Sequence, residues 1–109
     1  MNVRQILIGD IYWLKGEEEI PHPRVIININ ENNITVCSLT TNQKKVDMPG
    51  NVILVPGEGN LDRPSIVEVS KVLTIDKSQL GEYIGTLSEE RVKQILNGIG
   101  FLERSFFSN

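Results

Sequence analysis

The sequence predicts a mainly β-stranded chain that ends in one α-helix. Short apolar runs, rich in Val, Ile and aromatic residues, alternate with Gly, Pro and Asn turn signals between residues 11 and 75. This alternation is typical of a small β sandwich or barrel. From Ser88 onward the apolar residues recur at helical spacing instead. At 109 residues the chain fits one domain, 1–109.

The strands follow from their β-branched and aromatic content and from the turns between them. Gly9-Asp10 is a turn signal, and we expect residues 6–8 before it to form a short lead-in or edge strand. The Asn-rich turn at 30–33 joins its flanking strands into a hairpin, because Asn tolerates left-handed backbone. The predicted strands are 11–14, 24–29, 34–39, 52–55 and 65–70, the last continuing over 72–75 after a kink.

The helix is predicted to begin directly after Ser88. Serine is a good N-cap, and Glu89 and Glu90 suit the positive end of a helix dipole. Gly98 and Gly100 each weaken a helix by about 1 kcal/mol relative to Ala, so they favour a close approach to a sheet or a partner. The apolar stripe of this helix comprises Val92, Ile95, Leu96, Ile99 and Leu102.

Composition and charge narrow the class of protein. An apolar content of 39% and a charged content of 23% are ordinary for a soluble globular chain. No window is apolar enough for a membrane span, and the N-terminus lacks a signal-peptide pattern, so we expect a cytoplasmic protein without membrane contact. A net charge of −3 counts against a general nucleic-acid binder but allows a local basic patch. One Cys and one His predict neither a disulfide framework nor a metal site, and we expect no cofactor.

The residues that carry chemistry gather at one end of the predicted hairpin. Antiparallel pairing would bring the start of strand 24–29 beside the end of strand 34–39. The start of strand 24–29 carries the guanidinium of Arg24, and the only histidine of the chain, His22, lies just before it. Hydroxyl, amide and ammonium groups follow the second strand, on Thr40, Thr41, Asn42, Lys44 and Lys45.

Each of these residues also has a purely structural interpretation. His22 stands between two prolines and could be a loop residue, and threonines are common at strand ends. Arg24 could pair with a glutamate of the acidic loop 17–19. Alternatively, that loop could border a substrate groove beside the hairpin end and repel RNA until the substrate or a partner displaces the loop. Cys37 is expected to be a buried strand residue, and Trp13 is expected to pack in the core.

Several segments resemble the MazF/PemK toxin family, in the same order along the chain. Residues 9–13 resemble its Gly-Asp-Ile start, 22–27 its Arg-Pro-Val-Val-Val-Ile strand, and 38–42 its Pro-Leu-Thr-Ser-Asn segment. Residues 74–78 and 84–88 are similar to its Thr-Val-Asp-Lys-Ser and Ile-Gly-Xaa-Leu-Ser patterns. The resemblance implies an SH3-like small β barrel of the MazF/PemK/CcdB toxin type, with a C-terminal helix.

The resemblance also implies a function. Toxins of this kind belong to type II toxin-antitoxin systems and act as homodimers that a cognate antitoxin protein neutralises. They cleave single-stranded mRNA sequence-selectively and without metal, leaving a 2′,3′-cyclic phosphate and a 5′-hydroxyl. This would make the chain a growth-inhibiting endoribonuclease with single-stranded RNA as its substrate.

The family pattern assigns roles to particular positions. Its hydroxyl near the scissile phosphate falls on Thr40, and its catalytic Arg falls on His22. Arg24 could supply the guanidinium instead, because residues two apart in a strand face the same side. Alternatively, His22 could transfer protons, since histidines have an ordinary pKa of about 6.5. Substrate-binding roles are expected for Thr41, Asn42, Lys44 and Lys45, and for Glu68, which falls in an acid–base slot of the late strand and is an alternative base.

Two other functions are also compatible with the sequence. A non-catalytic relative could use the same barrel to bind a partner protein or a nucleic acid. A gyrase-directed toxin of the related fold would act through the end of the C-terminal helix, and the hairpin residues would then be dispensable.

Overall fold

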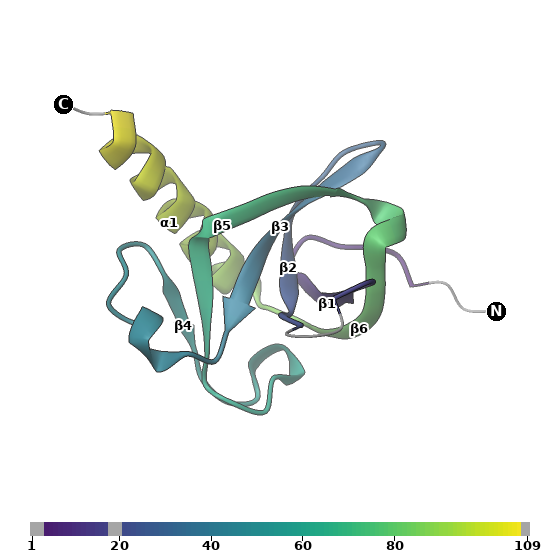
Figure 1. Cartoon of the computed structure of the whole chain (residues 1–109), viewed down its shortest axis with the longest axis horizontal. Helices are drawn as coiled ribbons and strands as arrows, with labels where there is room; N and C mark the ends of the chain where they lie inside the picture. Colours follow the sequence, from purple (N-terminus) through teal and green to yellow (C-terminus); the bar gives the residue numbers. More distant parts are fainter. Residues whose placement is uncertain (1–3, 18–20, 108–109) are drawn as a thin grey trace.

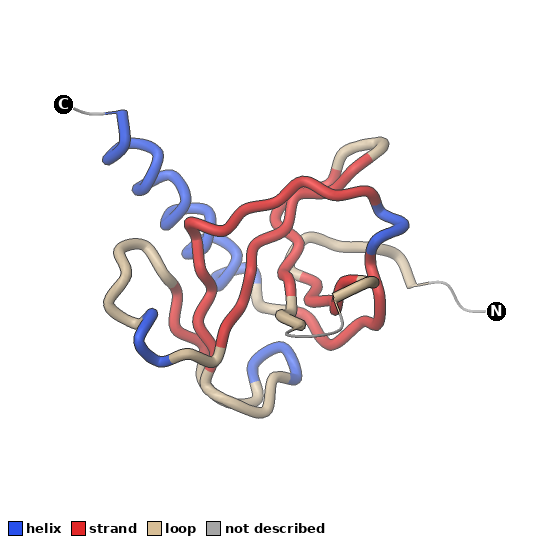
Figure 2. The backbone as a smooth tube through the Cα atoms, in the orientation of Figure 1, coloured by secondary structure: helices blue, strands red, loops and turns tan. Residues whose placement is uncertain are grey.

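A curled antiparallel sheet forms the body of the protein, and one helix crosses its side (Figures 1 and 2). The computed structural model describes residues 4–17 and 21–107. Its six strands lie in the order β4-β5-β3-β2-β1-β6, and every neighbouring pair is antiparallel. The bounds are β1 Asp10–Leu14, β2 Arg24–Ile29, β3 Asn33–Thr40, β4 Val52–Leu54, β5 Ser65–Asp76, β6 Leu80–Thr86 and α1 Glu89–Phe107, with single 3₁₀ turns η1 Gln43–Lys45, η2 Glu58–Asn60 and η3 Lys77–Gln79.

The predicted fold class is confirmed, with differences in the elements. The predicted strands are present, and β5 is one long strand whose pairing with β3 jumps from Val72 to Glu68, where the kink was expected. The predicted strand at 6–8 is wrong: Leu7 and Ile8 lie in an irregular segment and are 47% exposed. β6 is an additional strand that its glycine-containing sequence did not indicate.

The core divides into two clusters on opposite faces of the sheet. Alternate residues of one strand enter different clusters, as Ile11 and Tyr12 do. The larger cluster is covered by α1, whose Ile95 is fully buried, whereas Leu96 of the predicted stripe is 46% exposed. Cys37 also lies in this cluster, as predicted, and its burial raises the pKa of the thiol to about 12, which suppresses its reactivity.

α1 begins as the sequence predicts. The Ser88 hydroxyl accepts a hydrogen bond from the Arg91 amide at 3.2 Å, which caps the first turn. Gly98 lies against the carbonyl oxygen of Gly50 and the side chain of Val69 on β5, so the expected close approach to a sheet is confirmed at this glycine. At Gly100 the nearest atoms belong to the flexible Arg104 side chain. No helix within the described residues has the length and apolarity to cross a membrane.

The buried carboxylate of Asp10 joins the start of β1 to the end of β6 and to the segment before β1. One oxygen of Asp10 accepts from Arg4 Nη2 at 2.9 Å and from the Thr86 hydroxyl at 2.7 Å, and the other accepts from the Leu7 amide at 2.9 Å. The Arg4 guanidinium also stacks over the Tyr83 ring, 3.8 Å from its centroid. The Gly-Asp pair therefore closes a turn and also joins β1 to β6.

Candidate functional site

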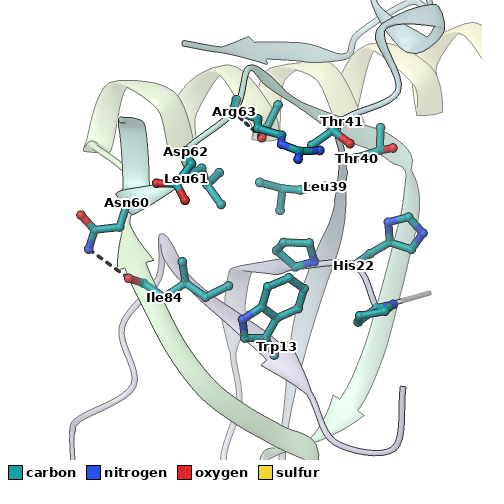
Figure 3. Close-up of a pocket in the computed structure, with 13 residues that line it drawn as sticks. Trp13, His22, Leu39, Thr40, Thr41, Asn60, Leu61, Asp62, Arg63 and Ile84 are labelled. Atoms are coloured by element: carbon teal, nitrogen blue, oxygen red, sulfur yellow. Dashed lines mark hydrogen bonds between the residues drawn. The ribbon is translucent and has the colours of Figure 1, made fainter. Parts of the chain in front are cut away.

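A pocket of about 490 Å³ opens beside the end of the β2–β3 hairpin (Figure 3). Its floor is apolar, and its rim carries hydroxyl, imidazole, amide, carboxylate and guanidinium groups. Such a combination of apolar floor and convergent polar groups is typical of a ligand site. The apolar floor includes Trp13, Leu39, Leu61 and Ile84, and the polar rim includes His22, Thr40, Thr41, Asn60, Asp62 and Arg63.

Strand pairing builds the first wall. Arg24 at the start of β2 stands opposite Ser38 near the end of β3, and the Leu39 amide donates to the carbonyl of Pro23 at 3.0 Å. The predicted meeting of the two hairpin ends is thus confirmed. As a consequence, His22, Thr40 and Thr41 line the same pocket.

The Thr40 side chain is fixed in place. It is 9% exposed, and its oxygen accepts a hydrogen bond from the Asn42 amide at 3.1 Å. Because a hydroxyl carries one proton and two lone pairs, the Thr40 O–H is still able to donate to a bound group. The Asn42 side chain accepts from the Lys44 amide at 3.1 Å and caps η1. The pocket lining ends at Thr41 on this side and does not include the next predicted residues, Asn42, Lys44 and Lys45.

Arg24 does not line the pocket. Its guanidinium forms a two-point ion pair with Glu17, at 2.9 and 3.2 Å, and also donates to the carbonyl of His22. With a side chain only 12% exposed, Arg24 has little freedom to turn toward a substrate. The interpretation in which Arg24 pairs with a glutamate of the acidic loop is thus confirmed for Glu17, while Glu18 and Glu19 lie outside the described residues.

Glu68 is also separate from the pocket. It lies on β5 opposite Ser38 and is 4% exposed. Its carboxylate is 3.6 Å from the ammonium of Lys71, and it is absent from the pocket lining. The sequence predicts Glu68 as a substrate-binding residue or an alternative base. In the structure its carboxylate lies beside Lys71 and outside the pocket.

Trp13 corrects an expectation. It was predicted to pack in the core, which is wrong: its side chain is 36% exposed and lines the pocket. Alternation along β1 places Trp13 on the face opposite Tyr12 and Leu14, and on that face it lines the pocket while Ile11, two residues earlier, is buried in the larger cluster.

The second wall comes from the segment 60–65, which sequence reasoning did not connect to the site. The Asn60 amide group donates to the carbonyl of Ile84 at 3.0 Å, and the Ser65 hydroxyl donates to that of Arg63 at 3.0 Å. Gln43 joins the two walls, since its side-chain amide donates to the carbonyls of both Thr41 and Pro64 at 3.2 Å. These contacts hold the backbone of the second wall at a fixed separation from the first.

An ion pair anchors the loop that precedes this wall to α1. Glu58 Oε1 accepts from Arg91 Nε at 2.8 Å and Oε2 accepts from Arg91 Nη2 at 3.0 Å, while Oε2 also accepts from the Val55 amide. Hydrogen bonding to Arg91 lowers the pKa of Glu58 below its ordinary value. The charged form of Glu58 is therefore favoured by folding.

Replacing Glu58 by Gln should lower the free energy of unfolding by about 1 kcal/mol at neutral pH, because a charge-assisted pair is lost. A lowered folded-state pKa stabilises the protein above the ordinary pKa of Glu, and the contribution disappears as pH falls through the folded value. The difference between Glu58→Gln and wild type should therefore shrink as the pH falls below the ordinary pKa of Glu, about 4.3, and close once the pH is below the folded-state pKa. Urea unfolding at several pH values measures this, with Glu82→Gln, an exposed glutamate, as control. A difference that is independent of pH would contradict it.

Comparison with known proteins agrees with this architecture. The sequence profile of the PemK-like, MazF-like toxins of type II toxin-antitoxin systems matches residues 8–102. The endoribonuclease MazF of Staphylococcus saprophyticus is 26% identical over 100 residues, which cover 86% of this chain and 83% of that protein.

Solved structures of similar fold agree as well. A mycobacterial endoribonuclease in complex with its cognate antitoxin has a TM-score of 0.73 at 20% identity, covering 89% of this chain and 93% of that one. The toxin MazF-mt6 of Mycobacterium tuberculosis has a TM-score of 0.70 at 23% identity, covering 84% and 93%. At these low identities the solved structures support only the fold. The family is shown by the profile, which matches residues 8–102. The chain belongs to the family of PemK-like, MazF-like toxins of type II toxin-antitoxin systems.

Proposed function

We propose that this chain is an endoribonuclease toxin that cuts single-stranded RNA in the pocket between the hairpin end and segment 60–65. The observation that carries the proposal is that Thr40 and His22 line the same pocket, in a member of a toxin family. Relatives of similar sequence and fold are named endoribonucleases, which supports the same reaction class here.

The reaction that suits these groups uses the substrate's own nucleophile. The ribose 2′-oxygen attacks phosphorus and loses its proton, while the P–O5′ bond breaks and the 5′-oxygen gains a proton. The products are a 2′,3′-cyclic phosphate and a 5′-hydroxyl. His22 is the residue of the pocket rim best suited to one of these proton transfers near neutral pH. The Thr40 hydroxyl donates to a non-bridging phosphate oxygen, where charge accumulates.

The rest of the pocket suits a nucleotide. The half-exposed indole of Trp13 offers a face for a base, an interaction worth about 1–3 kcal/mol that tolerates any sequence. Thr41 lies on the rim beside Thr40, and Lys44 and Lys45 follow on η1. Their ammonium groups are suited to flanking phosphates, which would position the strand without reading its bases.

The test is a cleavage assay with pure, antitoxin-free protein, single-stranded RNA and excess EDTA. Wild type should cut, His22→Ala should lose most of the rate, and Lys93→Ala, a change on the exposed face of α1, should cut normally. If EDTA stops cutting, the metal-independent chemistry is wrong. If wild type binds RNA but does not cut it, the chain is a binding module instead of an enzyme.

A homodimer, a cognate antitoxin partner and a cytoplasmic location complete the proposal. Exposed apolar side chains on α1 and β5, including Leu96, Phe101, Val72 and Leu73, support association with a second copy. One mycobacterial relative was solved with its cognate antitoxin, which supports a partner of that kind. Light scattering of the purified chain should give twice the mass of one chain, and the mass of a single chain would overturn the dimer.

A further inference from the structure

The pocket rim contains one side chain with a permanent positive charge. Of the described residues that line it, Arg63 is the only Lys or Arg. Arg24, which the sequence offered as the source of a guanidinium, is held by Glu17 outside the pocket. A phosphate that enters the pocket therefore meets its strongest donor on segment 60–65 and not on the hairpin.

The backbone of Arg63 is fixed while its side chain is exposed. Its carbonyl accepts from the Ser65 hydroxyl, and Gln43 holds the carbonyl of the next residue, Pro64. Within the described chain, the guanidinium takes part in no ion pair. In Figure 3 it extends toward Thr41, while the neighbouring carboxylate of Asp62 points in a different direction. The backbone of Arg63 is thus held in place, while its guanidinium is available to bind a ligand.

We propose that Arg63 binds the scissile phosphate from the wall opposite the hairpin and stabilises the negative charge that develops in the transition state. This inference rests on the proposed RNA cleavage and names a further catalytic residue for it. The planar fork of a guanidinium matches two phosphate oxygens at once and keeps its charge at any physiological pH. Thr40 and Arg63 would then hold the phosphate from two sides.

The arrangement divides two tasks between two residues. An imidazole can accept or donate a proton near neutral pH, but its positive charge is only partial there. A guanidinium provides constant charge but is a poor proton carrier, because it stays protonated at every physiological pH. With His22 on one wall and Arg63 on the other, proton transfer and charge stabilisation are both present in the pocket.

Steady-state kinetics on a single-stranded RNA that wild type cuts would test Arg63. Arg63→Ala should lower kcat by about 100-fold or more while KM changes little, because the contact is strongest in the transition state. Arg63→Lys should retain part of the rate, and added guanidinium ion should restore part of it to Arg63→Ala only. Arg104→Ala, which removes an exposed guanidinium from α1, is the matched control and should behave as wild type.

Other outcomes separate the alternatives. A kcat of Arg63→Ala close to that of wild type, in a protein with an unchanged melting temperature, would overturn the proposal. A rise in KM with kcat unchanged would also overturn it, because Arg63 would then only tether the substrate. Loss of kcat in Arg24→Ala, with Arg63→Ala unaffected, would assign the guanidinium to Arg24. If wild type itself does not cut RNA, it is the proposed function that fails.

Discussion

Replacing Thr40 by valine should lower kcat for RNA cleavage by about 100- to 1,000-fold, the usual effect of removing one donor that faces developing charge. Valine keeps the shape of threonine, so the pocket volume hardly changes. The lost group is a hydroxyl whose oxygen is held by the Asn42 amide at 3.1 Å. That hydrogen bond fixes the oxygen and leaves the proton to be donated into the pocket. The rate should be measured under single-turnover conditions with saturating enzyme.

Two controls separate chemistry from structure in this experiment. Thr40→Ser retains the hydroxyl and should recover most of the rate. Thr35→Val makes the same replacement on β3 outside the pocket and should cut as wild type does. A Thr40→Val variant that melts at the wild-type temperature and cuts at the wild-type rate would remove the hydroxyl from the mechanism.

A second large effect is expected on stability, at Gly98. A Cβ at this position would overlap the carbonyl oxygen of Gly50 and lie 3.1 Å from the Val69 side chain. Because the first obstacle is backbone, α1 and the turn that contains Gly50 must move apart to relieve the overlap. Gly98→Ala should therefore lower the free energy of unfolding by about 2 kcal/mol or more, even though alanine favours the helix.

Gly100→Ala is the matched comparison, two residues further along the same helix. There a Cβ meets only the end of the flexible Arg104 side chain, at 3.1 Å. This substitution should raise the free energy of unfolding by up to about 1 kcal/mol through helix propensity. Urea denaturation of both variants measures the contrast. Equal effects of the same sign would show that Gly98 does not support close packing of α1.

Local patterns predicted most of the fold because the features involved are local. The helix start at Ser88, the hairpin around residues 30–33 and the kink in β5 follow from a cap, a turn and a break in apolar alternation. β6 was not predicted because Gly81 and Gly85 interrupt the apolar alternation that is typical of a strand. Those glycines are explained only by tertiary contacts, since a Cβ at Gly85 would overlap the backbone of Gly59.

The site was predictable only where it is built from the hairpin. His22, Thr40 and Thr41 meet because two neighbouring strands pair, which sequence patterns reveal. Arg63 reaches the same pocket through the segment between η2 and β5, whose position depends on Gln43, Asn60 and Ser65. No local pattern encodes that placement. The sequence left two interpretations of Arg24 open, and only the fold selects the pairing with Glu17 over a place in the pocket.

The end groups of the RNA fragments test the central claim most directly. Mass spectrometry of fragments that the wild-type protein produces from a single-stranded oligonucleotide in EDTA should find a 2′,3′-cyclic phosphate on one side of the cut and a 5′-hydroxyl on the other. A deoxyribose immediately 5′ to the cut should abolish cleavage there, because the attacking oxygen is missing. Fragments that end in a 3′-hydroxyl and a 5′-phosphate would contradict attack by the 2′-oxygen and, with it, the roles proposed for His22 and Thr40.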